Sequence, residues 1–455
     1  MRTPSRLSSS IAFLLLFGLA LPLAPPSEAQ PAPRARNVIL FISDGAGPAV
    51  FTMARDYQRD YLRAGERLAL DQILVGAVRT YSADSRTTDS AAGATAFSTG
   101  HKTYNGAVAV DADRRPRPTV LEAAEARGMA TGLVATSSVT HATPAAFSAH
   151  VPDRGMQLEI AAQQMGKGID VIFGGGRRYY TPAEQDGARE DGRDLLAEMK
   201  DAGYTVALSR ADFAKVEQTP AVALFAADHM AYEIDRDTLA QPSLAEMTWK
   251  AIDLLSSNPE GFLLVVEGSR IDHAAHGNDV AGTLHDALAY DRAVRVALDF
   301  ARADRETLVI SVSDHETGGL SLGRADGANY AWQPEVVARV SASAGRIQSA
   351  LRRGDRAPEA VLADYTGITD LSAEEADRLN RAVGGEGRLD QVLSDLIGRR
   401  ASIGWTTGGH SAVDVNLYAF GPGSERLRGN HENTVVARVV TEVLGLDLGR
   451  VALPK

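Results

Sequence analysis

Short apolar runs alternate along the chain with longer segments of helical composition. The short runs lie at residues 38–42, 75–81, 130–137, 170–173, 262–266, 307–312 and 415–420. Those at 38–42 and 262–266 are unbroken, which is typical of strands buried in a mostly parallel sheet. Helical patterns lie between them, at residues 119–127, 157–165, 244–255, 283–301 and 434–444. This alternation predicts an α/β fold.

The pattern changes between Gly318 and Gly404, where the apolar runs become shorter. Residues 371–396 are rich in helix-forming and charged residues. We therefore expect residues 318–404 to form an inserted, mainly helical cap or crown-like subdomain. Residues 37–455 as a whole are expected to form one domain, with this insert within it.

The N-terminal residues have the pattern of a processing signal. Arg2 and Arg6 form a basic start, residues 11–23 are mostly apolar, and small residues at 27 and 29 suit cleavage. We expect a signal peptide at residues 1–29, a flexible tether at 30–36, and a periplasmic or secreted protein. An uncleaved anchor is the alternative, although the apolar run is short for a membrane span. No second long apolar run follows, so no membrane span is expected after signal removal.

Composition limits the chemistry that the chain can perform. It contains no cysteine, so a metal ion would be bound by His, Asp and Glu. Its formal net charge of −11 argues against sequence-independent nucleic-acid binding. An acidic protein can still bind phosphate if dications dominate the local field.

Three apolar strands are followed directly by acidic or histidine side chains. The first run leads to Asp44, the run at 262–266 leads to Glu267, and the run at 307–312 leads to Asp314 and His315. Open α/β sheets bind ligands at the carboxyl ends of their strands, which is where these residues are expected.

Further metal ligands are suggested by spacing. Asp272 and His276 are four residues apart, so both face one side of a helical turn. His410 follows two glycines, which let the backbone approach a site closely. Taken singly, each could be an ordinary surface residue. Together, these nitrogen and carboxylate ligands suit zinc, and two zinc ions roughly 4 Å apart can activate a nucleophile and hold a leaving oxygen.

Residues 87–100 predict a short helix that presents a hydroxyl group. Ser90 would lie at its N-terminus, where free N–H groups and the helix dipole favour an anion. Alternatively, Thr88, Asp89 or Ser90 serves only as the N-cap.

Taken together, these motifs resemble the bacterial alkaline phosphatases in order and spacing, over about residues 37–445. Residues 404–415 resemble the Bacillus-type members more than the enterobacterial ones. The resemblance implies a mixed, mostly parallel central sheet with helices on both faces. It also implies a nucleophile, Ser90, and a phosphate-binding arginine, Arg154. It implies three metal sites: Asp272, His276 and His410 for one zinc; Asp44, Asp314 and His315 for a second; and Asp44, Thr143 and Glu267 for a magnesium ion.

Two positions vary within the resembled family. Enterobacterial members have a carboxylate where His141 stands and a lysine where His273 stands, whereas other members have histidine at both. We place His141, His273 and Asp89 around the metal ligands rather than among them. Since histidine alters the third site, zinc or cobalt is an alternative to magnesium there.

The resemblance implies a phosphate monoester hydrolase of broad specificity that acts through a phosphoserine at Ser90 and releases inorganic phosphate. A phosphodiesterase or sulfatase on the same metal core is one alternative. A non-catalytic exported protein that binds phosphate or metal is another. Family members are commonly dimers, so a homodimer is possible.

Overall fold

The structure is a computed structural model that describes residues 34–326 and 330–453. The predicted signal peptide, residues 1–29, lies outside the described residues. Residues 30–33 of the predicted tether also lie outside them. Among the described residues, no helix has both the length and the hydropathy needed to cross a membrane.

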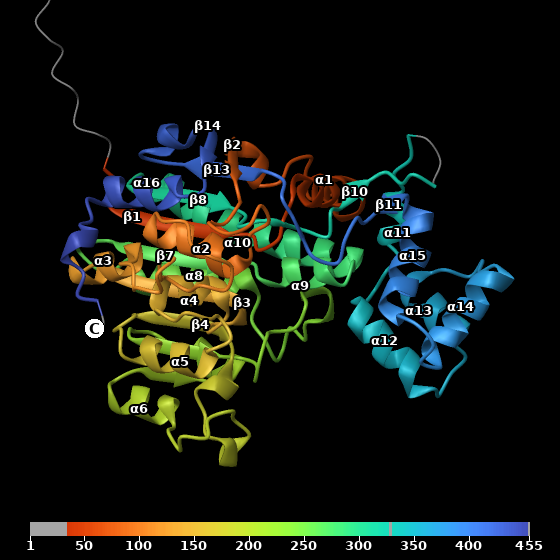
Figure 1. Ribbon diagram of the computed structural model, residues 1–455, viewed down its shortest axis with the longest axis horizontal. Coiled ribbons are helices and arrows are strands. Elements are labelled where there is room, and N and C mark those ends of the chain that lie inside the picture. The colour runs from red at the N-terminus through yellow and green to blue at the C-terminus, as the bar shows by residue number, and fades with distance from the viewer. Residues whose placement is uncertain (1–33, 327–329, 454–455) are drawn as a thin grey trace, which may run out of the picture. The chain divides into compact units, whose positions relative to one another are not determined.

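The described chain is built around one ten-stranded sheet with the order β14-β2-β13-β8-β1-β7-β3-β4-β6-β5 (Figure 1). Its pairs are parallel except those of β13, which runs antiparallel to both β2 and β8. The predicted fold class, a mixed and mostly parallel sheet, is therefore confirmed. The strands are β1 Asn37–Ile42, β2 Leu74–Arg79, β3 Ala130–Ser138, β4 Val171–Gly175, β5 Thr205–Ala207, β6 Ala221–Leu224, β7 Phe262–Glu267, β8 Thr307–Val312, β13 Val415–Phe420 and β14 Gly429–Glu432.

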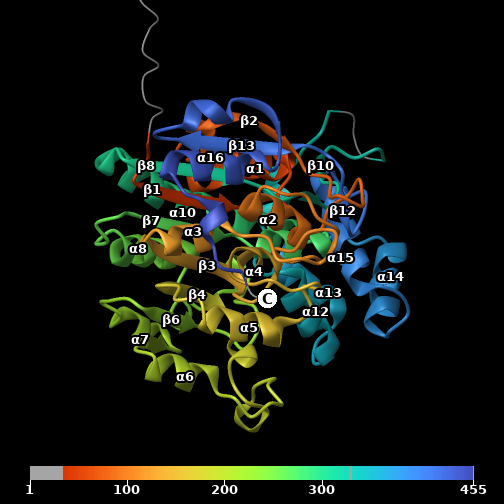
Figure 2. The same ribbon diagram turned by 60° about the vertical axis from the view of Figure 1, so that its left-hand side comes forward.

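Helices cover both faces of the sheet because each central strand is apolar on both sides. In β1, Ile39 and Phe41 join one core cluster, while Val38, Leu40 and Ile42 join the other. The first face is covered by α1 Pro48–Tyr57, α7 Arg210–Ala214, α8 Leu244–Leu255, α9 Arg270–His276 and α10 Val280–Asp304. The second face is covered by α2 Ser90–Thr99, α3 Val120–Ala126, α4 Ala142–Ser148, α5 Gln157–Met165, α6 Leu195–Asp201 and α16 Val435–Leu444 (Figure 2).

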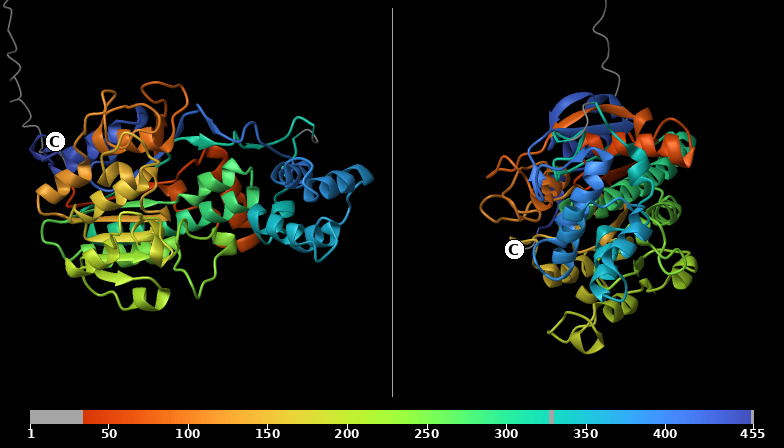
Figure 3. Two further views of the ribbon diagram at one scale, coloured as in Figure 1. Left: turned by 60° about the horizontal axis from the view of Figure 1, so that its bottom comes forward. Right: turned by 90° about the vertical axis from the view of Figure 1, so that its right-hand side faces the viewer.

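The remaining α-helices of the described residues lie in the stretch that was expected to be an insert. They are α11 Pro334–Val337, α12 Ala344–Arg353, α13 Pro358–Thr366, α14 Ala373–Val383 and α15 Leu389–Ala401. In Figure 3 these cyan-to-blue helices lie together, to one side of the sheet. The treatment of residues 318–404 as a separate subdomain stays a prediction.

Two short antiparallel pairs join this helical stretch to the sheet. β9 Glu316–Thr317 pairs with β12 His410–Ser411, and β10 Ser321–Leu322 pairs with β11 Ile403–Gly404. The chain therefore enters and leaves the helical stretch at the same place. As a result, His410 is brought back beside the end of β8.

Candidate active site

Helix α2 places Ser90 at its first position. The Asp89 side chain caps the helix by accepting a hydrogen bond from the Ala92 N–H at 2.9 Å, and Gly100 ends the helix with φ of +74°. Ser90 is buried, and its Oγ lies 3.2 Å from His315 Nε2. The cap is thus Asp89, while Ser90 has its hydroxyl among the predicted metal ligands.

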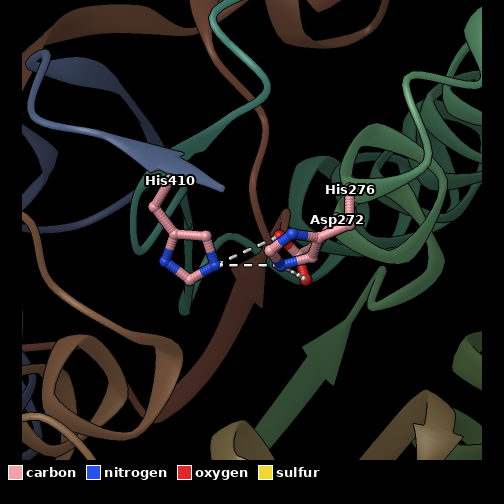
Figure 4. A group of neighbouring side chains, drawn as sticks. All are labelled: Asp272, His276 and His410. Carbon is pink, nitrogen blue, oxygen red and sulfur yellow. Dashed lines mark hydrogen bonds and ion pairs between the residues drawn. The ribbon is translucent and has the colours of Figure 1, made fainter. Parts of the chain in front are cut away.

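Asp272, His276 and His410 converge as predicted (Figure 4). Asp272 and His276 lie one turn apart on α9, with 3.3 Å between Asp272 Oδ2 and His276 Nε2. His410 comes from β12, and its Nε2 lies 3.1 Å from His276 Nε2 and 3.7 Å from Asp272 Oδ1. Two helical residues and one residue 134 positions away in the chain therefore present ligand atoms to a single point.

Backbone carbonyl groups set the orientation of both imidazole rings. His276 Nδ1 lies 2.8 Å from the carbonyl oxygen of Gly408, and His410 Nδ1 lies 2.8 Å from that of Thr88. Because a carbonyl oxygen can only accept, each Nδ1 carries a proton, and each Nε2 presents its lone pair. The hydrogen bond with Asp272 raises the pKa of His276 to about 9, so a proton and a metal ion compete for the same lone pair.

The second group, Asp44, Asp314 and His315, is fully buried. His315 Nε2 lies 3.3 Å from Asp314 Oδ2 and 3.6 Å from Asp44 Oδ1. Both carboxylate oxygens of Asp44 and Oδ2 of Asp314 have no hydrogen-bond partner. Buried carboxylate oxygens are normally paired, so this cluster has the donor set of a cation site.

Gly45 allows the first two groups to lie close together. Its φ is +71°, and a Cβ atom there would lie 2.8 Å from the Cα of Asp272. Thr317 Oγ1, on β9, also joins the groups: it donates to Asp272 Oδ1 at 2.5 Å and lies 3.2 Å from His315 Nδ1. Sequence reasoning missed Thr317, whose only signal was its position two residues after His315.

Asp44, His141 and Glu267 form the third group of possible ligands. Thr143 is also predicted in this group. Three buried atoms here have no hydrogen-bond partner: Thr143 Oγ1, Glu267 Oε1 and His141 Nδ1. His141 was expected to lie outside the ligand set, yet the structure brings it beside two of the predicted ligands. That His141 lies around the metal ligands rather than among them stays a prediction.

The electrostatics of these groups reflect crowded, buried negative charge. Burial and the charge of Asp314 raise the pKa of Asp44 well above its usual range. Burial also raises the pKa of Asp314 to about 6 and that of Glu267 to about 7. Such groups ionise readily only beside a cation. The residues present therefore fit bound dications.

Arg154 lies at the rim of the same site. Its Nη1 donates to Asp89 Oδ2 at 3.0 Å, and its Nη2 lies 3.1 Å from His141 Nε2. The guanidinium group is therefore held near Ser90 by the residue that caps helix α2. The predicted Arg154 and Asp89 are thus brought to the site.

The structure also places His229 at the site, although the sequence does not single it out. The His229 ring packs against His273 with centroids 4.5 Å apart, and against His141 at 5.4 Å. His273 in turn contacts Arg270, whose Nη1 lies 2.7 Å from its Nδ1. His229 follows the short strand β6 without any motif, so the sequence offered no signal for it.

The fold and this site define a metal-dependent hydrolase. A family model described as "Alkaline phosphatase" matches residues 35–446. The repressible alkaline phosphatase of Saccharomyces cerevisiae is 39% identical, with 91% of this chain and 82% of that protein aligned. Alkaline phosphatase 3 of Bacillus subtilis is 38% identical over 98% of this chain and 97% of its own length. The crystal structure of Thermus thermophilus alkaline phosphatase matches with a TM-score of 0.83 and 35% identity, over 93% of this chain and 96% of that one.

The chain belongs to the alkaline phosphatase family. It is accordingly an enzyme, a phosphate monoester hydrolase with a metal site, and the predicted resemblance to the Bacillus members is confirmed.

Proposed function

We propose that the chain hydrolyses phosphate monoesters of broad specificity through a phosphoserine intermediate at Ser90. The observation that carries the proposal is the position of Ser90 Oγ, buried at a helix N-terminus and 3.2 Å from His315 Nε2. A hydroxyl group in that position faces the groups that would hold a phosphate ester, and the free N–H groups of α2 favour its negative charge.

The proposed reaction is a double displacement at phosphorus. The Ser90 hydroxyl releases its proton, and its Oγ forms a bond to phosphorus while the bond to the leaving oxygen breaks. That oxygen takes up a proton and departs as the alcohol. Water then attacks the phosphoserine, the Oγ–P bond breaks, and inorganic phosphate leaves. Ser90 regains its proton and is ready for another cycle.

Arg154 is proposed to bind the phosphate group throughout both steps. Its planar guanidinium offers parallel N–H donors that match two phosphate oxygens. The ion pair with Asp89, at 3.0 Å, holds the guanidinium at the N-terminus of the serine helix. A dianionic monoester makes fuller use of this arrangement than a diester does.

The proposed metal content is two zinc ions and one magnesium ion. Asp272, His276 and His410 would hold one zinc, and Asp44, Asp314 and His315 the other, because mixed nitrogen and carboxylate ligands suit zinc. Asp44, Thr143 and Glu267 would hold magnesium through oxygen ligands. The nitrogen of His141 beside this group makes zinc or cobalt the alternative there. When bound, the ions would supply positive charge that favours ionised Ser90 and a negatively charged leaving oxygen.

We further propose that the protein is exported to the periplasm or secreted. The basis is the basic and apolar pattern of residues 1–29, and the relatives leave the compartment open. A homodimer is proposed from the resemblance alone.

The test is hydrolysis of p-nitrophenyl phosphate at about pH 9–10, the range expected for metal-activated hydroxyl chemistry. We expect Ser90→Ala to lower kcat by ~10³-fold or more, because no other hydroxyl replaces the nucleophile. Ser98→Ala is the matched control, since Ser98 is a buried serine on the same helix. Activity of Ser90→Ala equal to that of Ser98→Ala would contradict the proposal. A preference for bis-p-nitrophenyl phosphate would favour a phosphodiesterase instead.

A further inference from the structure

A turn at Tyr104–Gly106 contacts both halves of the proposed phosphate site. It follows α2 in the chain and lies between the segment that leads into Ser90 and the loop that carries Arg154. Gly106 has φ of +92°, and the Tyr104 carbonyl accepts from the Ala107 N–H at 3.2 Å. This closes a tight turn.

The Asn105 side chain binds the segment that precedes Ser90. Its Oδ1 accepts a hydrogen bond from the Asp89 N–H at 3.0 Å, and its Nδ2 donates to the Thr87 carbonyl at 3.0 Å. Its own N–H donates to Asp84 Oδ1 at 3.1 Å. Asn105 thereby binds the backbone on both sides of Thr88, whose carbonyl accepts from His410.

The residues on either side of Asn105 bind the arginine loop. The Gly106 carbonyl accepts a hydrogen bond from the Arg154 N–H at 2.8 Å. The Tyr104 hydroxyl donates to the Pro152 carbonyl at 2.9 Å. Three consecutive residues therefore fix the backbone of Asp89 and that of Arg154 relative to each other.

These contacts matter because the two side chains depend on each other. Asp89 caps α2 and binds the Arg154 guanidinium, so a shift of either backbone would move both Ser90 and the phosphate-binding group. A displacement of about 1 Å at a reacting centre can cost ~10²-fold in rate. Asn105 is itself exposed and has no core to fill, so packing does not account for its contacts.

We infer that Asn105 is a positioning residue of the phosphate site, which holds the N-terminus of the Ser90 helix at a fixed distance from Arg154. This inference rests on the roles proposed above for Ser90 and Arg154. Asn105 acts through backbone contacts and takes no part in bond making.

The test compares Asn105→Ala with Asn258→Ala. Asn258 makes the same pair of contacts in an exposed turn: its Oδ1 accepts from the Glu260 N–H at 2.8 Å, and its Nδ2 donates to the Gly128 carbonyl at 3.2 Å. It precedes β7 and so lies at the end of the sheet opposite the site. We expect Asn105→Ala to raise KM for p-nitrophenyl phosphate and the inhibition constant of inorganic phosphate by ~10-fold each, with a smaller fall in kcat and unchanged zinc content. Asn258→Ala should match the wild type.

A double variant tests whether Asn105 acts through Arg154. Asn105→Ala added to Arg154→Ala should change the phosphate inhibition constant by less than ~2-fold, because the group that it positions is already gone. Full additivity would overturn the inference, as would Asn105→Ala kinetics equal to those of Asn258→Ala.

Tyr104→Phe keeps the test valid if Asn105→Ala does not fold. It removes only the hydroxyl bonded to Pro152, and we expect a rise of ~3-fold in the phosphate inhibition constant at unchanged kcat, about what one lost hydrogen bond gives. No change in that constant would then overturn the inference. The proposed function fails separately: it fails if Ser90→Ala stays active, whatever Asn105 does.

Discussion

The positions of single side chains at this site depend on how closely neighbouring backbone segments can pack against them. Gly45 follows the predicted ligand Asp44, and its α-carbon lies against Asp272, a predicted ligand from a different strand–helix unit. The two groups of predicted metal ligands can come this close only because no side chain stands at position 45. A left-handed φ and a crowded neighbour both require glycine there.

We predict that Gly45→Ala lowers kcat/KM by ~10-fold or more and weakens retention of bound metal. The new Cβ would lie 2.8 Å from the Asp272 Cα, so the backbone that carries Asp44 must shift. Gly354→Ala is the control: its φ is +68°, but no atom lies within 4 Å of the added Cβ. Zinc content after dialysis and p-nitrophenyl phosphate kinetics would measure both effects. Equal behaviour of the two variants would show that crowding against Asp272 is unimportant.

The sequence placed residues well where several motifs agreed. Asp44, Asp314 and His315 follow apolar strands, and Asp272 and His276 have helical spacing, so their convergence could be predicted. His229 and Thr317 could not, because each reaches the site through tertiary packing that leaves no local pattern. The exact neighbours of His141 also depend on side-chain packing rather than on spacing.

At the scale of elements, helix α10 and its N-cap residue carry three buried aspartates that accept hydrogen bonds from backbone N–H groups of other segments. Asp279 accepts from Ala344 at the start of α12, at 2.7 Å. Asp286 accepts from Glu233 at 3.1 Å. Asp291 accepts from Ala69 and Leu70, at 3.0 Å each. One helix thus fixes three loops, and each contact places a carboxyl group in the interior.

We predict that Asp286→Asn stabilises the protein relative to the wild type as pH rises. Burial raises the pKa of Asp286 to about 8, so the folded protein binds a proton that the unfolded chain releases above about pH 4. The wild type therefore loses stability between these values, whereas asparagine is neutral throughout and keeps an oxygen to accept from Glu233. The gap in unfolding free energy between Asp286→Asn and the wild type should grow by more than ~1.4 kcal/mol from about pH 5 to pH 9, the equivalent of one pKa unit.

Thermal unfolding at several pH values would measure this difference. Asp253→Asn, at an exposed position on α8, is the control and should show no such trend. A constant difference between Asp286→Asn and the wild type across the pH range would contradict the prediction.

Elements with a strong pattern could be predicted, and short ones could not. The central strands β1, β7 and β8 are continuous apolar runs, and α5 and α8 begin and end at the predicted residues. β5 and β14 at the sheet edges, and β6 beside β5, have three or four residues, too few to establish a period. α4 was not among the predicted helices: it has only seven residues, and Pro144 falls in its first turn.

For the whole molecule, bound metal and folding are expected to be coupled. Asp44, Asp314 and Glu267 have raised pKa values, so repulsion and burial penalise their ionised forms. Without dications this penalty grows as pH rises from about 4 through about 7, where the unfolded chain would release these protons. Bound cations would remove this penalty, because they favour the ionised carboxylates.

We predict that chelation lowers the unfolding temperature, and that the gap between metal-loaded and chelated protein widens from about pH 5 to pH 8. One ion at about 100 times its dissociation constant stabilises by about 2.7 kcal/mol. Ser90→Ala should keep the gap, because it removes no carboxylate. A gap that does not change with pH, or no effect of chelator, would contradict this coupling.

The pairing of β9 with β12 has a consequence for the history of the chain. Thr317 lies opposite His410, and Leu322 opposite Ile403, so residues 323–402 leave and rejoin the sheet at neighbouring points. The length of this inserted segment has little influence on the position of His410. Lineages could lengthen, shorten or exchange these helices as a unit without rebuilding the catalytic centre. Diversity among relatives would then accumulate there, while the ribbon of paired residues that closes the inserted segment stays constant.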